Sequence, residues 1–217
     1  MKTQRFKNLE LTRTKTVNNI LRVYDSSPHA IKYDAKDWYT EARVFATDLY
    51  NKASGWHESL SFAKVCGIIA ALSPQKSWSE NKRIAESFLT TGKAYHTKML
   101  KDKARDILDL SSSENEIEEI SDILKGNKIS NFFLNIFSGV ADAVTIDTHA
   151  THIAVNDVTI RPYPMTTNQY NFFVQCYRIA GAKRGVKPSV MQAITWVAWR
   201  EDKKSTKVEE GEDDLPF

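Results

Sequence analysis

The apolar residues of this chain recur three and four positions apart, which is the spacing of one face of an α-helix. The pattern predicts helices at residues 14–24, 35–54, 60–72, 78–89, 113–124, 128–137, 166–183 and 188–200, and another that starts near residue 147. The 60–72 segment is apolar almost all round, which is typical of a buried central helix. No stretch alternates with the period of two that a half-buried strand requires. The sequence therefore predicts an all-α fold.

Two of these helix starts carry a capping box, in which a Ser or Thr is followed three positions later by Glu or Gln. Ser113 and Glu116 form the first box, and Thr166 and Gln169 form the second. Each hydroxyl residue is therefore predicted to cap the helix that follows it.

The two cysteines, Cys66 and Cys176, both fall inside apolar helical patterns, which predicts buried thiols. Two thiols cannot hold a four-thiolate iron–sulfur cluster, and no residues are spaced like the ligands of a zinc site. The sequence therefore predicts neither a metal nor another cofactor.

No apolar stretch approaches the length of about eighteen residues that a membrane span needs. The first residues, MKTQRFKNLELTRTK, are charged and lack the apolar core of a secretory signal. We therefore expect no membrane contact and a cytoplasmic location.

The net charge of +3 is unevenly distributed. Residues 208–217 hold five acidic residues and no basic one, so the rest of the chain is much more basic than the total suggests. A basic body with an acidic tail predicts a polyanionic partner, and DNA is the main candidate. A lysine-rich protein without a nucleic-acid partner is the alternative.

Two side chains that carry chemistry stand at predicted helix starts. Lys128 follows a tight turn at Gly126 and opens an apolar helix, and Asp147 opens the helix near residue 147. An amine and a carboxylate held together can attack a sugar carbon and stabilise the charge that forms on it.

Three segments, in this order, resemble the catalytic core of the helix-hairpin-helix DNA glycosylases of the endonuclease III type. They read ALSPQKSWSENKRIAESFL, LKGNKISNFFLN and TIDTHATHIA, and the resemblance covers about residues 60–154. It implies an all-α, two-lobed helical fold for residues 1–200, with the active-site cleft between the lobes. Residues 201–217 are then expected to form a disordered acidic tail.

The resemblance also implies roles for individual residues. Lys128 stands on the position of the catalytic lysine, Asp147 on that of the catalytic aspartate, and Gln75 on that of a glutamine inserted near the lesion. The implied DNA-binding residues are Gln75, Lys76, Lys82, Lys125, Gly126, Asn127 and His152. Trp78 and His149 are the candidates for the base pocket, because the target base must be flipped out of the duplex.

Two departures from the family pattern bear on these roles. The family hairpin reads Leu-Pro-Gly-x-Gly-x-Lys, and only its second glycine remains here, as Gly126. Its backbone amides normally bind a DNA phosphate, and Lys125 could add charge there. The cluster cysteines of the family are absent, so the resemblance is to a divergent branch without the iron–sulfur cluster. A pattern of the form WY…A…A…ALSP…W..N resembles uncharacterised phage proteins, which implies a phage-type protein in the cytoplasm of a bacterial host.

Several residues keep a second interpretation. Lys128 could instead contact a phosphate, and Asp147 could serve only as a helix cap. His149 could be a structural hydrogen-bonding residue, and His152 could touch a phosphate or complete a polar cluster in the core. Phe132 and Phe133, which could stack on bases, fit core packing better.

The last residues, GEDDLPF, resemble the acidic tip of bacterial single-stranded-DNA-binding proteins. The resemblance implies docking onto a host replication or repair protein through Asp213, Asp214, Leu215, Pro216 and Phe217. A tail that only improves solubility is the alternative.

The sequence thus predicts a DNA glycosylase with lyase activity, in which Lys128 is the nucleophile and Asp147 its electrostatic partner. A second hypothesis is a phage transferase that modifies DNA bases on the same fold. A third is a non-catalytic protein that binds DNA or, through its acidic tail, a partner.

Overall fold

The computed structural model describes residues 11–139 and 142–210. Within these residues every regular element is a helix, which confirms the predicted all-α class. In chain order the elements are α1 (Arg13–Ser26), α2 (His29–Ala35), α3 (Trp38–Ala53), a short 3-10 helix η2 (Ser54–Trp56), α4 (Phe62–Ala71), α5 (Trp78–Thr91), α6 (Lys98–Leu108), α7 (Glu116–Leu124), α8 (Asn127–Ser138), α9 (Thr148–Val155), α10 (Thr167–Arg184) and α11 (Pro188–Glu210).

The chain divides into two compact units, each with its own core. Unit 1 combines the two ends of the chain, Met1–Trp38 and Asp142–Phe217, and unit 2 is the central segment Tyr39–Ala141. In the part of the chain that is described, no helix is both long enough and apolar enough to cross a membrane.

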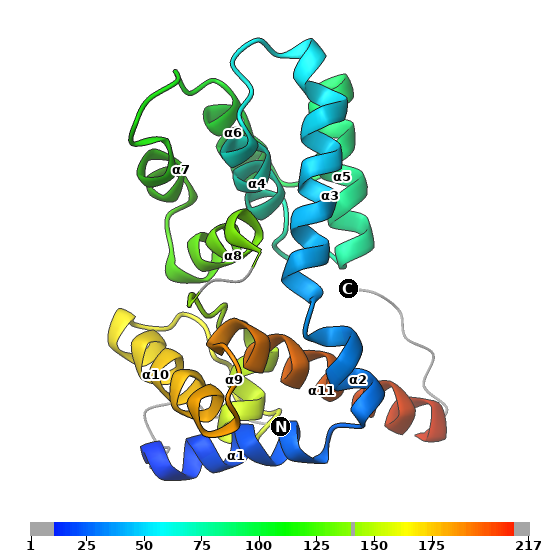
Figure 1. The fold of residues 1–217 in the computed structure, drawn as a ribbon, viewed down its shortest axis with the longest axis vertical. Coiled ribbons are helices and arrows are strands. Elements are labelled where there is room, and N and C mark those ends of the chain that lie inside the picture. Colours follow the sequence, from blue (N-terminus) through cyan, green and yellow to red (C-terminus); the bar gives the residue numbers. More distant parts are fainter. Residues whose placement is uncertain (1–10, 140–141, 211–217) are drawn as a thin grey trace. The chain divides into compact units, whose positions relative to one another are not determined.

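Unit 2 is built around α4, as the all-round apolar pattern predicts. Residues 63–71 of α4 are all buried, and α5, α6, α7 and α8 pack against the helix (Figure 1). Gly67 lets α6 and α7 approach closely, because a Cβ at this position would lie 2.7 Å from Cγ2 of Ile120 and 3.3 Å from Cγ2 of Ile107.

A fully buried lysine completes this packing. Lys64 lies on α4, and its ammonium donates hydrogen bonds to the carbonyls of Ser59, Leu108 and Leu110. Two of these carbonyls belong to the C-terminal end of α6 and the residues after it, where backbone acceptors lack intrahelical partners. The charge of Lys64 therefore fastens the end of α6 to the central helix.

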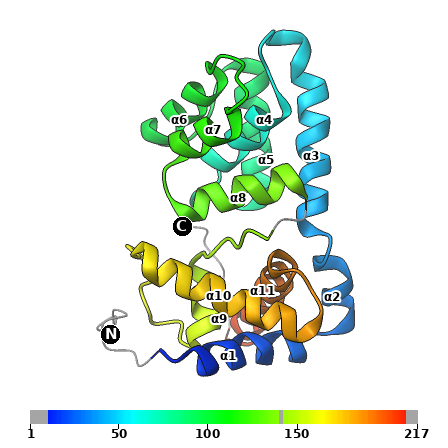
Figure 2. The same cartoon turned by 60° about the vertical axis from the view of Figure 1, so that its left-hand side comes forward.

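Unit 1 packs α1, α9, α10 and α11 around a second core. Figure 2 shows α1 alongside α9 and α10. Val17, Ile20, Ile153, Phe173 and Tyr177 are almost completely buried in this core. Arg184 of α10 and Asp25 of α1 add a two-armed ion pair with N–O distances of 2.6 and 2.7 Å.

One predicted capping box is confirmed and the other is wrong. The Thr166 hydroxyl accepts from the Gln169 amide, and the Gln169 side chain accepts from the Thr166 amide. At the other site the helix starts later, at Glu116, and Ser113 is not its N-cap. The Ser113 hydroxyl instead donates to the carboxylate of Glu119 at 2.9 Å, so it stabilises the loop before α7.

The C-terminal helix is longer than the sequence predicts. Disorder is expected from Glu201 onwards, whereas α11 continues to Glu210. The added residues are mostly Glu, Asp and Lys, which extend an existing helix at little cost because nucleation has already occurred. The predicted partner-binding residues Asp213, Asp214, Leu215, Pro216 and Phe217 lie outside the described residues.

The close approach at Gly67 leads to a stability prediction. Gly67→Ala should lower the free energy of unfolding by about 1–3 kcal/mol, because the branched side chains of Ile107 and Ile120 must move. Chemical denaturation followed by circular dichroism measures this. Gly55→Ala is the control, since nothing lies within 4 Å of a Cβ there. Equal losses in the two variants would contradict the packing argument.

Both cysteines are buried, as predicted, and this makes a second test possible. Burial raises the pKa of the Cys66 thiol to about 12 and that of Cys176 to about 11. The reactive thiolate is therefore a minor species at pH 8. Neither thiol should react with iodoacetamide in the folded protein at pH 8, and both should react in denaturant. Fast alkylation of the folded protein, detected by mass spectrometry, would contradict this.

Candidate functional site

Asp147 lies in unit 1 at the start of α9, and the predicted helix start is confirmed. Its Oδ1 accepts the backbone N–H of Ala150 at 2.7 Å, which caps the helix. Its Oδ2 accepts the indole N–H of Trp196, from α11, at 2.8 Å. Both carboxylate oxygens are thus held by N–H donors. An ionised carboxylate has about four acceptor positions, so Asp147 keeps room for a further partner.

Three tyrosine hydroxyls fix the backbone on both sides of Asp147. Tyr163 donates to the carbonyl of Ile146, Tyr170 donates to Val144 at 2.8 Å, and Tyr177 donates to Ala150 at 3.0 Å. Tyr170 also accepts the N–H of Ile146 at 3.1 Å. The carboxylate therefore stands on backbone that is hydrogen-bonded from several directions.

Tyr163 and Tyr177 remain neutral donors across the ordinary pH range. Burial raises the pKa of Tyr163 and of Tyr177, and the negative charge of Asp147 raises both further. Because a tyrosine that stays protonated keeps its hydroxyl hydrogen, the bonds to the Asp147 segment are maintained.

Trp196 is the centre of a small group of rings and charges around Asp147. The Arg200 guanidinium lies over its ring at 4.6 Å from the centroid. The ring of His149 meets it edge-on at 6.1 Å, and that of Trp38 at 6.3 Å. Trp196 and Arg200 are functional candidates that the sequence prediction missed. Their spacing of four on one helix is visible in the sequence, but the bond of Trp196 to Asp147 and the stacking of Arg200 on Trp196 are not.

His152 faces the interior of unit 1. Its side chain is 7% exposed, and its Nε2 lies 2.9 Å from the carbonyl of Ile160. This position corresponds to the second of its two interpretations, a polar contact in the core. A phosphate contact would require the side chain to leave the core.

Lys128 lies in unit 2, in the first turn of α8, so its predicted helix start is confirmed. The candidate pair therefore draws one residue from each unit. Between α7 and α8, the exposed residues Lys125 and Gly126 both adopt positive φ angles, of 49° and 123°. Gly126 is the N-cap of α8 and provides no side chain to bond its first amides. The amides in the first turn of a helix attract anions.

Lys103 is a second lysine that is hydrogen-bonded at this turn. Lys103 of α6 donates from its half-buried ammonium to the carbonyl of Leu124, the last residue of α7. Burial lowers the pKa of Lys103, and the nearby charge of Lys125 lowers it further. The charges of Lys103 and Lys125 therefore lie at the turn before α8. The exposed residue Asn127, the first of α8, belongs to the same turn.

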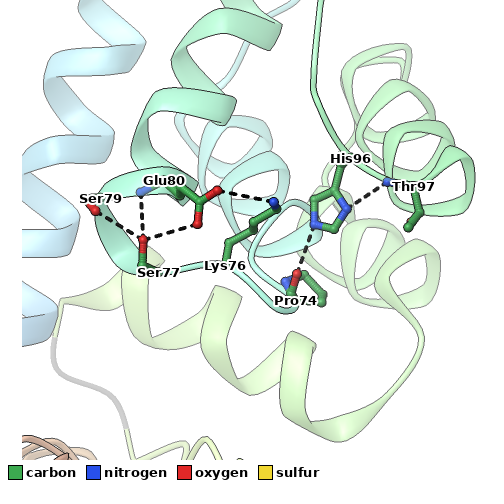
Figure 3. A network of polar contacts seen from close by, with 7 residues as sticks. All are labelled: Pro74, Lys76, Ser77, Ser79, Glu80, His96 and Thr97. Atoms are coloured by element: carbon green, nitrogen blue, oxygen red, sulfur yellow. Dashed lines mark hydrogen bonds and ion pairs between the residues drawn. The ribbon is translucent and has the colours of Figure 1, made fainter. Parts of the chain in front are cut away.

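The predicted DNA-binding glutamine lies on the loop between α4 and α5. Gln75 is exposed and has a φ of 60°, which is unusual for a residue with a side chain. Next to it, Lys76 is ion-paired with Glu80 at 3.3 Å, and this hydrogen bond holds the pKa of the Glu80 carboxyl below its usual value. Figure 3 shows Lys76 and Glu80 in this contact.

Lys82 and Trp78 belong to an aromatic group inside unit 2. The Trp78 ring meets Phe45 edge-on at 5.7 Å and Phe132 at 6.5 Å. The Lys82 ammonium lies 5.6 Å from the ring centroid of Phe45 and 5.8 Å from that of Trp78, which favours a cation–π interaction. Phe133 is fully buried, which confirms the core position predicted for it.

The comparisons with known proteins give a family. Residues 2–203 match the model of a group described as "Family of unknown function (DUF7178)". No curated protein and no solved structure matches the chain. Within the described residues, no group of three His, Cys, Asp or Glu side chains is placed to hold a metal ion.

The indole bond to Asp147 leads to a direct prediction. Trp196→Phe removes the N–H donor and keeps an aromatic ring, so the free energy of unfolding should fall by about 1–3 kcal/mol, the range for a hydrogen bond to a charged group. Thermal and chemical denaturation measure this. Trp56→Phe is the control, because Trp56 is 60% exposed and should tolerate the change. Unchanged stability in Trp196→Phe would show that the bond contributes nothing.

Proposed function

The chain belongs to the DUF7178 family, whose function is unknown, and we propose from its own residues that it is a DNA glycosylase with lyase activity on a two-lobed, helix-hairpin-helix fold. One observation carries the proposal: the Asp147 carboxylate is held by two N–H donors on a segment that three tyrosines fix in place. The resemblance of the sequence around Lys128 and Asp147 to that family supports it.

The chemistry needs a fixed negative charge. When the bond between a base and its sugar breaks, positive charge develops on the sugar ring, and a carboxylate already in position stabilises it. Asp147 requires little reorganisation, because its helix cap and its bond to Trp196 both hold it in the folded protein. The proposed role of Asp147 is this electrostatic stabilisation.

Lys128 is the proposed nucleophile. Its amine attacks C1′ and displaces the base, which leaves with one amine proton. The C1′–O4′ bond then breaks, O4′ takes the second amine proton, and a Schiff base joins Lys128 to the opened sugar. Removal of a proton from C2′ then breaks the C3′–O bond and releases the 3′ phosphate. The mechanism requires Lys128 and Asp147 to reach the same sugar.

The turn before α8 is the proposed phosphate contact. The hairpin has lost one of its two glycines, but the helix start of α8, which no N-cap side chain bonds, and the charges of Lys103 and Lys125 remain. Backbone amides at a helix start and lysine charges both bind phosphate. Lys103 would thus add charge that the shortened motif does not predict.

A base-modifying transferase on the same fold is the second candidate. The observation that favours it is the hairpin itself, in which Leu124 is buried and Gly126 is the only glycine. A transferase would bind a flipped base without cutting its bond to the sugar.

Incision of a DNA duplex that carries one abasic site tests the proposal. The unaltered protein should nick the strand, and Lys128→Ala should abolish nicking, because no amine remains to form the Schiff base. Lys98→Ala is the control, since Lys98 is exposed and paired with Asp102. No nicking by the unaltered protein, with a mass increase on modified bases, would support the transferase instead.

A further inference from the structure

Gln75 has a backbone conformation that residues with a side chain rarely adopt unless neighbouring groups hold it. At a φ of 60°, the Cβ of Gln75 crowds the neighbouring peptide, and glycine is the residue that normally adopts this region. The side chain is exposed, so its own packing does not hold it there. The hydrogen bonds around Gln75 therefore have to select this conformation.

One half of the support lies within the loop. The Lys76 amide donates to the Ser73 carbonyl at 3.2 Å and closes a turn across Gln75. The Ser77 hydroxyl then accepts the Glu80 amide at 3.2 Å and starts α5. These bonds shape the residues on either side of Gln75, but they do not tie the loop to another element.

His96 provides that tie. Its Nε2 lies 3.0 Å from the carbonyl oxygen of Pro74, and its Nδ1 lies 2.8 Å from the amide nitrogen of Thr97 (Figure 3). A backbone amide only donates, so Nδ1 is the acceptor and carries no proton. The proton is therefore on Nε2, which donates to Pro74.

The hydrogen bond from His96 to Pro74 lies directly beside the strained φ angle of Gln75. The Pro74 carbonyl belongs to the peptide plane that ends at the Gln75 nitrogen, and the φ angle of Gln75 is the rotation that follows that plane. A hydrogen bond that fixes the carbonyl therefore fixes the starting point of the strained angle. On its other side, the His96 ring contacts the amide of Thr97, the N-cap of α6.

Helix α6, which follows His96, is held firmly within unit 2. α6 packs against α4 through the fully buried Ala104 and Ile107, close to Gly67. The C-terminal end of α6 is also held by Lys64. His96 therefore connects the loop of Gln75 to a helix that packs in the core of unit 2.

We propose that His96 is a positioning residue that holds the 73–77 loop in the conformation from which Gln75 contacts DNA. The DNA contact of Gln75 rests on the proposed function. The hydrogen bond by which His96 holds the loop is present in the protein without DNA. His96 does not touch the DNA in this account, and it acts through the Pro74 carbonyl.

Three variants separate the two ring nitrogens. His96→Gln places an amide donor near the position of Nε2, whereas His96→Asn places an acceptor near Nδ1 and does not reach Pro74. His96→Ala removes both groups. His57→Ala is the matched control, since the Nε2 of His57 also meets a backbone carbonyl, that of Leu89, at 2.8 Å in the same unit.

Amide hydrogen exchange in the free protein tests the hold on the loop. The Lys76 amide should exchange about tenfold faster in His96→Ala and His96→Asn, and near the unaltered rate in His96→Gln and His57→Ala. An unchanged Lys76 rate in His96→Ala would overturn the proposal, and so would a failure of His96→Gln to restore protection that His96→Ala loses.

A double-mutant cycle tests the link to Gln75. Binding is measured to a duplex with a tetrahydrofuran abasic analogue, by fluorescence anisotropy. His96→Ala should weaken binding about tenfold in the unaltered background and very little in the Gln75→Ala background. Equal losses in both backgrounds would overturn the link. If the unaltered protein binds no duplex, the proposed function fails, while the exchange rates still decide whether His96 holds the loop.

Discussion

The hydrogen bond between the Trp196 indole and the Asp147 carboxylate is the interaction on which the candidate site in unit 1 depends. It joins the start of α9 to α11, two helices that are far apart in the sequence. Because the second carboxylate oxygen caps α9, one side chain serves the helix start and the helix packing together. A substitution at Asp147 would therefore affect structure as well as chemistry: asparagine keeps one acceptor oxygen for the cap but replaces the other with an amide group that cannot accept the Trp196 indole N–H.

In unit 2, the candidate DNA-binding residues lie on turns that are attached to a rigid helical core. Its core is a helix buried on all sides, with a glycine where neighbours approach and a buried lysine that satisfies three carbonyls. The segments that would face DNA, the turn before α8 and the loop of Gln75, both contain residues at positive φ. Such strained segments are tolerated where a rigid support holds them.

The sequence predicts the helical class, the buried α4 and the helix starts at Lys128 and Asp147, because apolar spacing and capping residues are local signals. It misplaces the start of α7, since Ser113 has the residue type of a cap but bonds Glu119 instead. It also ends α11 too early, because charge alone does not distinguish a disordered tail from a charged helix. The contacts of Trp196 with Asp147 and of His96 with Pro74 are tertiary, and no local pattern reveals them.

The central claim is that Lys128 forms a covalent bond with the sugar of the substrate. The most direct measurement is reduction with borohydride during incubation with an abasic duplex, followed by proteolysis and mass spectrometry of the cross-linked peptide. The account predicts one DNA adduct, on the amine of Lys128. An adduct on another amine, such as that of Lys103 or Lys125, or no adduct at all, would contradict it.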